Sequence, residues 1–443
     1  MREERNDARS AALRVLRQMD RAAAWADAGL DAELRRSGLA GQEAALAARL
    51  VYGVLQNRAL LDHYLGAYCS QKIDHLQKPL ADILRLGAYQ IVFLDRVPDS
   101  AAVNTSVELC RDCGRGQASG LVNAVLRKVA ANKDNLPPVP EKDAVSYLAT
   151  RYSHPKWLVR RLLSLVGREE AECFLRADNA PAPITVQTNT ILTAPEALRA
   201  SLEAEGVQVT PGLLPGSFQL RGTGNLTKLA AFQAGHFQVQ DDAAALVTEA
   251  MDLRGGEQVL DVCAAPGGKS FRCAMAMGDK GRIVACDLYE NKLRRIEAGA
   301  KRLHLTAIET AALDGRSFRA EWENAFDLVL VDAPCSGLGI IRKKPEIRYK
   351  KADDLFALPV VQTAILENAS RYVKPGGQLL YSTCTILPEE NGQVTDEFLA
   401  GHPDFRRESF ALPVGKVPEG QITLWPQRQG TDGFYICRMR KAT

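Results

Sequence analysis

The C-terminal half of the chain, from about residue 237, alternates apolar segments of strand length with segments of helical periodicity. Three of the apolar segments are QVLDV, RIVACD and DLVLVD. Their apolar residues follow one another directly, which is typical of strands in a parallel sheet with helices on both faces. Ligands of such sheets bind beyond the carboxyl ends of the strands. We therefore predict a Rossmann-like domain over residues 237–443, with its functional residues at those strand ends.

The residues before this domain form two further regions. Residues 1 to about 134 carry apolar side chains at three- and four-residue spacing, which predicts a helical bundle over residues 1–140. The segment NLPPVPEKD contains three prolines and is interpreted as a linker. A fragment that starts near residue 144 is therefore expected to fold. Residues 144–236 combine strand and helix patterns, such as PITVQTNT and APEALRASLEAEG, and predict a small α/β domain. The overall fold class is multidomain α and α/β.

Charge and cysteine content limit the possible functions. The net charge of +3 over 443 residues excludes a polycation that binds nucleic acid by bulk charge alone. No apolar run approaches the ~20 residues that a membrane-spanning helix needs. The N-terminus, MREERNDARS, does not resemble a secretory signal, so a cytoplasmic protein is expected. The ten cysteines are then reduced thiols. The one CxxC pair, Cys110 and Cys113, lacks partner ligands, and no metal is predicted.

The segment LDVCAAPGGKS joins a strand to a helix through a glycine turn. It lacks the GxGxxG pattern of dinucleotide sites, and Cys263 stands where a P-loop needs its first glycine. Gly267 and Gly268 would let a ligand approach the backbone closely. Asp287, at the end of the next strand, could accept hydrogen bonds from ribose hydroxyls, and Asp314 could meet an adenine edge. We predict a methyltransferase turn that binds S-adenosyl-L-methionine.

Two cysteines follow the ends of two apolar strands, in DAPCSG and YSTCT. A thiolate that adds to C6 of a cytosine makes C5 nucleophilic, and a second thiol beside it could assist release of the product. Cys335 and Cys384 are the candidates, with Asp332 placed to contact N3 and the exocyclic amine. Helix N-termini and basic groups are expected to lower the pKa of the thiols. Spacing alone leaves open which cysteine attacks.

The motifs DVCAAPGGKS, DAPCSGLG, YSTCT and TDGFYICRM resemble those of the RNA (cytosine-5)-methyltransferase family, and FQVQDDAA resembles the segment that precedes its catalytic domain. The N-terminal helical region resembles the antitermination factor NusB. The resemblance implies that Cys384 is the nucleophile and that Cys335 assists release. It also implies a monomer that acts on 16S ribosomal RNA. The cofactor residues that it implies are Cys263, Ala264, Ala265, Pro266, Gly267, Gly268, Lys269, Asp287, Asp314 and Asp332.

A basic segment, IIRKKPEIRYKK, directly follows the first cysteine motif. Its position beside a catalytic loop favours contact with RNA phosphates over a merely solvated face. Two alternatives to a ribosomal RNA methyltransferase stay open on the sequence. One is a transfer-RNA cytosine-5 methyltransferase, and the other is a non-catalytic RNA-binding or antitermination factor. The intact glycine turn, the three aspartates and both cysteines argue against the second alternative.

Overall fold

A computed structural model describes residues 6–22 and 26–443. The chain divides into two compact units. Unit 1 comprises the chain up to Ala180 together with Ile341–Lys350, and unit 2 comprises Pro181–Ile340 and Lys351–Thr443. This division into two units does not test the boundaries of the three predicted domains, which stay predictions.

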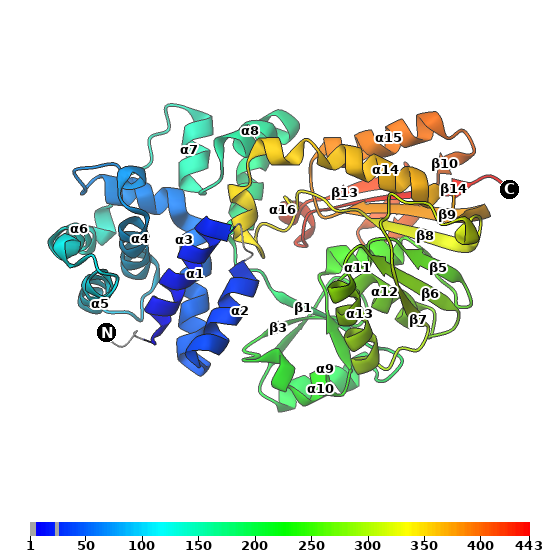
Figure 1. Cartoon of the computed structure of the whole chain (residues 1–443), viewed down its shortest axis with the longest axis horizontal. Helices are drawn as coiled ribbons and strands as arrows, with labels where there is room; N and C mark the ends of the chain where they lie inside the picture. The colour runs from blue at the N-terminus through cyan, green and yellow to red at the C-terminus, as the bar shows by residue number, and fades with distance from the viewer. Residues whose placement is uncertain (1–5, 23–25) are drawn as a thin grey trace. The chain divides into compact units, whose positions relative to one another are not determined.

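Unit 1 is helical, as predicted, and its helices are drawn in blue to cyan in Figure 1. They pack through a core of leucine, valine and alanine side chains such as Leu50, Val54 and Leu84. The helices are α1 (Ala8–Ala22), α2 (Ala26–Ser37), α3 (Gly41–Gly66), α4 (Lys78–Phe93), α5 (Asp99–Asp112), α6 (Ser119–Ala131), α7 (Ala144–Arg151) and α8 (Lys156–Asn179). Because α7 and α8 belong to unit 1, a cut near residue 144 would pass through this unit. That such a fragment folds stays a prediction.

The basic segment predicted to bind phosphates lies largely within unit 1, where Pro345–Tyr349 forms the short helix η6. Its Arg348 is 0% exposed, and its guanidinium donates to the carbonyl oxygen of Gln56 at 2.9 Å and to Asn179 Oδ1 at 3.0 Å. A side chain without exposed surface cannot contact RNA. The phosphate prediction is therefore wrong for Arg348, and it stays a prediction for the other basic residues of the segment.

Unit 2 begins with a small antiparallel sheet of order β2-β3-β1-β4. Its elements are β1 (Ile184–Thr188), α9 (Pro195–Ala204), β2 (Gln208–Pro211), β3 (Ser217–Arg221), α10 (Ala230–Gln233) and β4 (Phe237–Val239). The pattern of PITVQTNT predicted β1, and β2 and β3 pair with each other as antiparallel neighbours. Val186, Phe218 and Leu202 contribute to a core of its own under this sheet.

The second sheet of unit 2 has the order β10-β14-β9-β8-β5-β6-β7, with β13 paired to β14. The pairs among β5 to β9 are parallel, whereas β14 runs antiparallel to β9. The strands are β5 (Gln258–Asp261), β6 (Arg282–Asp287), β7 (Ile308–Ala312), β8 (Phe326–Asp332), β9 (Val373–Thr383), β10 (Phe405–Arg407), β13 (Gln421–Leu424) and β14 (Phe434–Lys441), and a separate hairpin joins β11 (Phe410–Leu412) and β12 (Gly415–Val417). This arrangement confirms the predicted Rossmann-like fold.

Helices cover both faces of this sheet, as Figure 1 shows. Strand β8 is apolar throughout because its successive side chains point to opposite faces of the sheet and both faces are covered. Leu328 and Leu330 pack into a core with the helices on one face, and Val329 and Val331 pack into a core with those on the other. The first face carries α11 (Asp242–Glu249), α12 (Gly268–Ala276) and α13 (Glu290–Arg302), and the second carries α14 (Leu358–Ser370) and α15 (Gly392–Gly401); the short α16 (Pro426–Gln429) precedes β14.

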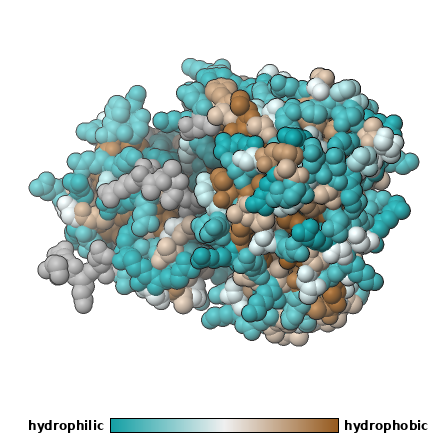
Figure 2. Space-filling model, turned by 45° about the vertical axis from the view of Figure 1, so that its right-hand side comes forward, coloured by the Kyte–Doolittle hydropathy of each residue, from teal (hydrophilic) through white to brown (hydrophobic). Residues whose placement is uncertain are grey.

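Hydrophilic residues cover most of the face seen in Figure 2, with apolar residues scattered between them in small groups. Across residues 6–22 and 26–443, the helices are all too short or too polar to span a bilayer.

Candidate active site

The polar residues of the site lie where the parallel strands of unit 2 end. Asp261, Asp287 and Asp332 are the last residues of β5, β6 and β8. The strand register pairs Asp332 with Ser382 on β9, two residues before Cys384. Because parallel strands end at one edge of the sheet, this register brings the predicted aspartates and the second cysteine motif to the same edge.

The glycine turn follows β5 and leads into α12. Gly267 is the N-cap of α12 and has a φ of +107°, a conformation that side chains other than glycine rarely adopt. A Cβ atom on Gly267 would lie 2.4 Å from the ring of Phe271. The turn is also bonded within unit 2, because Gly267 N donates to Ala264 O and Ala264 N to Cys286 O, both at 2.7 Å. The turn thus needs glycine for its φ and to make room for Phe271, and it leads into the N-terminus of α12, where a ligand can bind.

Asp287 lies beside this turn at the end of β6 and is 7% exposed. One carboxylate oxygen accepts a hydrogen bond from Tyr289 N at 3.1 Å, and Lys292 Nζ lies 3.3 Å away. The two following side chains, Leu288 and Tyr289, are 50% and 55% exposed although both are largely apolar. A carboxylate acceptor beside open apolar surface and a glycine turn fits the ribose and base of a nucleoside.

Asp314 follows β7 and forms a two-point ion pair with Arg316, with distances of 2.9 Å to Nε and 2.7 Å to Nη2. The hydrogen bonds from Arg316 lower the pKa of Asp314 below its ordinary value. Asp314 therefore stays ionised, and its predicted contact with an adenine edge remains a prediction.

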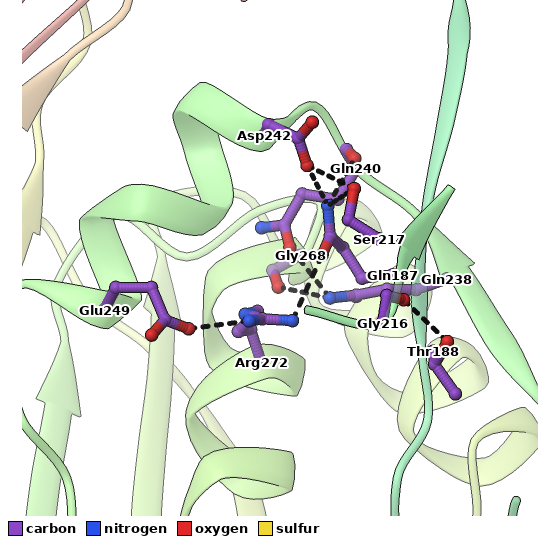
Figure 3. Close-up of polar contacts among 10 residues, drawn as sticks. All are labelled: Gln187, Thr188, Gly216, Ser217, Gln238, Gln240, Asp242, Glu249, Gly268 and Arg272. Carbon is purple, nitrogen blue, oxygen red and sulfur yellow. Dashed lines mark hydrogen bonds and ion pairs between the residues drawn. The ribbon is translucent and has the colours of Figure 1, made fainter. Parts of the chain in front are cut away.

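A buried polar network joins the small sheet to the glycine turn (Figure 3). Gln238 donates to Gly268 O at 3.2 Å and to Gln240 Oε1 at 2.9 Å. One turn further along α12, Arg272 donates to Gln187 Oε1 at 3.1 Å and to Glu249 Oε1 at 2.6 Å. Further bonds link Gln187 to Asp242, Ser217 to Asp242 and Thr188 to Gly216. The small sheet therefore contributes directly to the position of the turn.

The two candidate cysteines lie together: Cys335 Sγ is 3.2 Å from Cys384 Sγ. The hydrogen bond with Cys384 and burial raise the pKa of Cys335 well above its ordinary value, and the charges of Glu390 and Asp332 raise it further. The expectation that nearby groups lower the pKa is therefore wrong for Cys335. The charged groups that act on the pKa of this thiol are the carboxylates Glu390 and Asp332, so it stays protonated.

Asp332 lies beside the cysteines and forms an ion pair with Lys269, whose Nζ is 2.6 Å from Oδ2. Its other oxygen accepts a hydrogen bond from Ser382 Oγ at 2.8 Å. Burial lowers the pKa of Lys269, but Asp332 and, to a smaller extent, Cys384 raise it above its ordinary value. Lys269 is thus a buried cation between the glycine turn and the cysteines. The sequence motif indicated only a cofactor contact for Lys269 and not this ion pair.

Burial raises the pKa of Asp261 to about 7, although Ser270 donates a hydrogen bond to it at 2.7 Å. The sequence analysis missed Asp261, Ser382 and Glu390 as parts of the site. Their positions at strand ends, or within six residues of Cys384, were the available signal.

No three His, Cys, Asp or Glu side chains of the described ranges gather as metal ligands would. The sulfur of Cys110 instead lies 3.0 Å from Arg115 O, and burial raises the pKa of both Cys110 and Cys113.

The strand order, the glycine turn and Asp287 together define a Rossmann-like methyltransferase. Comparisons with known proteins place it further. Residues 248–440 match the family described as 16S rRNA methyltransferase RsmB/F, and residues 6–131 match the NusB family. Residues 154–227 match the ferredoxin-like domain of RsmF/B-like methyltransferases. The chain belongs to the RsmB/F family of 16S rRNA methyltransferases.

Relatives in bacteria support this assignment over the full length. The chain is 37% identical to the probable ribosomal RNA small subunit methyltransferase B of Bacillus subtilis, over 98% of both chains. It is 33% identical to the ribosomal RNA small subunit methyltransferase B of Vibrio cholerae, over 90% of this chain and 89% of the relative.

Two solved structures share the fold. The crystal structure of PH0851 aligns with a TM-score of 0.81 and 27% identity, covering 99% of both chains. A methyltransferase homologue from Pyrococcus horikoshii aligns with a TM-score of 0.59 and 28% identity, covering 68% of this chain and all of the other.

Proposed function

We propose that this chain methylates C5 of a cytosine in 16S ribosomal RNA in the cytoplasm, using S-adenosyl-L-methionine and a covalent bond between Cys384 and C6. The observation that carries the proposal is the pair of sulfurs 3.2 Å apart, of which one is held as a thiol. Two thiols at adjacent strand ends are what attack at C6 and subsequent release would require.

The chain's own residues divide the work as follows. The Cys384 sulfur adds to C6 as a thiolate. This addition breaks the C5–C6 double bond, and the electrons that it releases make C5 nucleophilic. Asp332, paired with Lys269, can accept a hydrogen bond from the exocyclic amine and so orient the base. The cofactor, bound at Cys263–Lys269 and Asp287, supplies an electrophilic methyl group.

Release needs the C5 proton to pass to a water molecule, the C5–C6 double bond to re-form and the Cys384 sulfur to depart as a thiolate. Cys335, which stays protonated beside that sulfur, can donate a hydrogen bond to it as it leaves. The protonated state of Cys335 therefore supports its role in release and leaves the attack to Cys384.

The substrate class rests on the family and on the helical part of unit 1. Residues 6–131 match the NusB family, and the sequence of this region already resembled the antitermination factor NusB. The target cytosine must leave any base stack before a sulfur can reach C6.

The test uses full-length protein and in vitro transcribed 16S ribosomal RNA. Cys384→Ala should lose both methylation and the covalent RNA adduct on denaturing gels. Cys335→Ala should form the adduct and methylate once, and the adduct should accumulate. Cys173→Ala, at an exposed cysteine of α8, is the matched control and should behave like the native enzyme.

An adduct in Cys384→Ala but not in Cys335→Ala would reverse the roles. Bisulfite sequencing of ribosomal and transfer RNA, from cells with and without the protein, identifies the substrate. Loss of 5-methylcytosine from transfer RNA alone would contradict the proposed substrate.

A further inference from the structure

Glu390 is a buried carboxylate whose part in the chemistry described above is limited to the effect of its charge on the pKa of Cys335. It ends the short helix η8 (Pro388–Glu390), six residues after Cys384, and is 1% exposed. Its Oε2 accepts hydrogen bonds from Ser336 N at 2.8 Å and from Gln362 Nε2 at 3.0 Å. Its Oε1 is buried without a hydrogen-bond partner in the described structure. A buried carboxylate is costly, so a position that keeps one calls for a specific role.

The partners of Glu390 lie on both sides of Cys335. Ser336 follows Cys335 directly, and Gln362, on α14, also donates to the carbonyl oxygen of Pro334 at 2.9 Å. Glu390 and Gln362 thus hold the residues before and after Cys335.

The same structure ties this loop to the turn that carries Cys384. Ser336 Oγ lies 2.7 Å from Thr385 Oγ1, and Asn391 Nδ2 donates to Thr385 O at 3.0 Å. The chain on both sides of Glu390 is held too, because Tyr381 donates its hydroxyl hydrogen to Glu390 O at 2.7 Å. Glu390 thus fixes the Cys335 loop, and Ser336 in turn connects that loop to the turn of Cys384.

We propose that Glu390 is a positioning residue for product release: by accepting hydrogen bonds from Ser336 N and Gln362, it keeps Cys335 beside Cys384. This inference rests on the proposed division of labour between the cysteines. Attack by Cys384 does not need Cys335 to be close, whereas release does. Loss of the two hydrogen bonds that Glu390 accepts should therefore slow release and leave attack and methyl transfer intact.

The choice of variants follows from the geometry. Glu390→Ala removes the acceptor, whereas Glu390→Gln can keep both bonds, because both end on a single oxygen that the amide carbonyl can replace. Glu397→Ala, at an exposed carboxylate on the adjacent helix α15, is the matched control. Gln362→Leu removes the amide that donates to both Glu390 and Pro334 O, and it serves as an independent variant.

The experiment uses full-length protein, in vitro transcribed 16S ribosomal RNA and radiolabelled S-adenosylmethionine. Glu390→Ala should accumulate the covalent adduct as Cys335→Ala does, and its multiple-turnover rate should fall by about 10²-fold, the cost of a displacement near 1 Å. Its single-turnover methyl transfer and its affinity for S-adenosylhomocysteine should match the native enzyme. Glu390→Gln should restore turnover, Gln362→Leu should show a smaller accumulation of adduct, and Glu397→Ala should show none.

Native turnover in Glu390→Ala would overturn the inference, as would Glu390→Gln behaving like Glu390→Ala. Loss of S-adenosylhomocysteine binding in Glu390→Ala would show a role in folding instead and would also overturn it. If Cys335→Ala itself accumulates no adduct, the proposed function fails at its release step. If Cys335→Ala accumulates adduct and Glu390→Ala does not, only the inference about Glu390 fails.

Discussion

Replacing Arg348 by methionine should destabilise unit 1 while leaving the sheet of unit 2 unchanged. Methionine keeps most of the aliphatic stem but removes the guanidinium. In the structure that group donates to Gln56 O at 2.9 Å, Ser153 O at 3.2 Å and Asn179 Oδ1 at 3.0 Å. These acceptors belong to α3, to the turn before α8 and to α8, so Arg348 connects three parts of unit 1.

Opposing terms set the size of the effect. Each buried acceptor left without a donor costs ~1–3 kcal/mol. The variant also avoids the desolvation of a buried cation, which costs several kcal/mol. That cost is visible in two ways: burial lowers the pKa of Arg348, and its Nε and Nη2 have no hydrogen-bond partner in the described structure. The net loss in the free energy of unfolding should be about 2–4 kcal/mol, which lies within the range for a broken buried network.

Hydrogen exchange at increasing urea, read by mass spectrometry, resolves the two units. Peptides of α3 and α8 should lose protection at a midpoint lower by roughly 1–2 M urea, and peptides of β8 and β9 should not shift. The control variant is Arg168→Met, which changes an exposed arginine on α8. It should change the free energy of unfolding by less than about 0.5 kcal/mol. An unchanged midpoint for α3 and α8, or an equal shift in both units, would refute the reasoning.

Four further predictions concern the cofactor site. Gly267→Val should abolish binding of S-adenosylhomocysteine in calorimetry, because the turn needs a φ of +107° and a Cβ would meet Phe271 at 2.4 Å; unchanged affinity would exclude this turn. Asp287→Ala should weaken binding by tenfold to a hundredfold, or ~1–3 kcal/mol, through the lost ribose acceptor, and a change below twofold would contradict that role. Gln238→Leu should raise the KM for S-adenosylmethionine by roughly tenfold, or ~1 kcal/mol, with kcat unchanged, because it loses its bond to the turn; a change in kcat alone would argue against it. Asp261 has its pKa raised by burial from 3.8 to about 7, so its contribution to stability is full below pH 4 and is lost as the pH rises through 7. That loss amounts to ~4 kcal/mol, and Asp261→Asn should remove it from the pH dependence of unfolding; parallel curves for both proteins would disprove it.

Much of unit 2 was predictable because its signals are local. Val329 and Val331 pack on one face of the sheet and Leu328 and Leu330 on the other, so a strand apolar at every position already indicates two covered faces. The glycine turn was recognisable because only glycine accepts the backbone conformation of Gly267. The positions of the cysteines after strand ends followed from the same alternation.

The grouping of the chain into units was not predictable in this way. The prolines of 135–143 indicated a boundary, yet α7 and α8 belong to unit 1, and so does Ile341–Lys350 from a distant part of the sequence. Arg348 has the same residue type as a phosphate-binding arginine, and only the carbonyl groups around it in the folded unit make it a structural side chain. A charge run has no periodicity that would distinguish these two environments.

By itself, the sequence determined the sheet, the glycine turn and the presence of two thiols at neighbouring strand ends, because these depend on residue spacing along the chain. Only the tertiary structure decided how those thiols differ. The pKa of Cys335 is raised by the adjacent Cys384, by burial, and by the carboxylates of Glu390 and Asp332, which come from different strands and loops. Electrostatic energies depend on distance through space and on exclusion of water. Neither quantity exists until the chain has folded and brought these groups together.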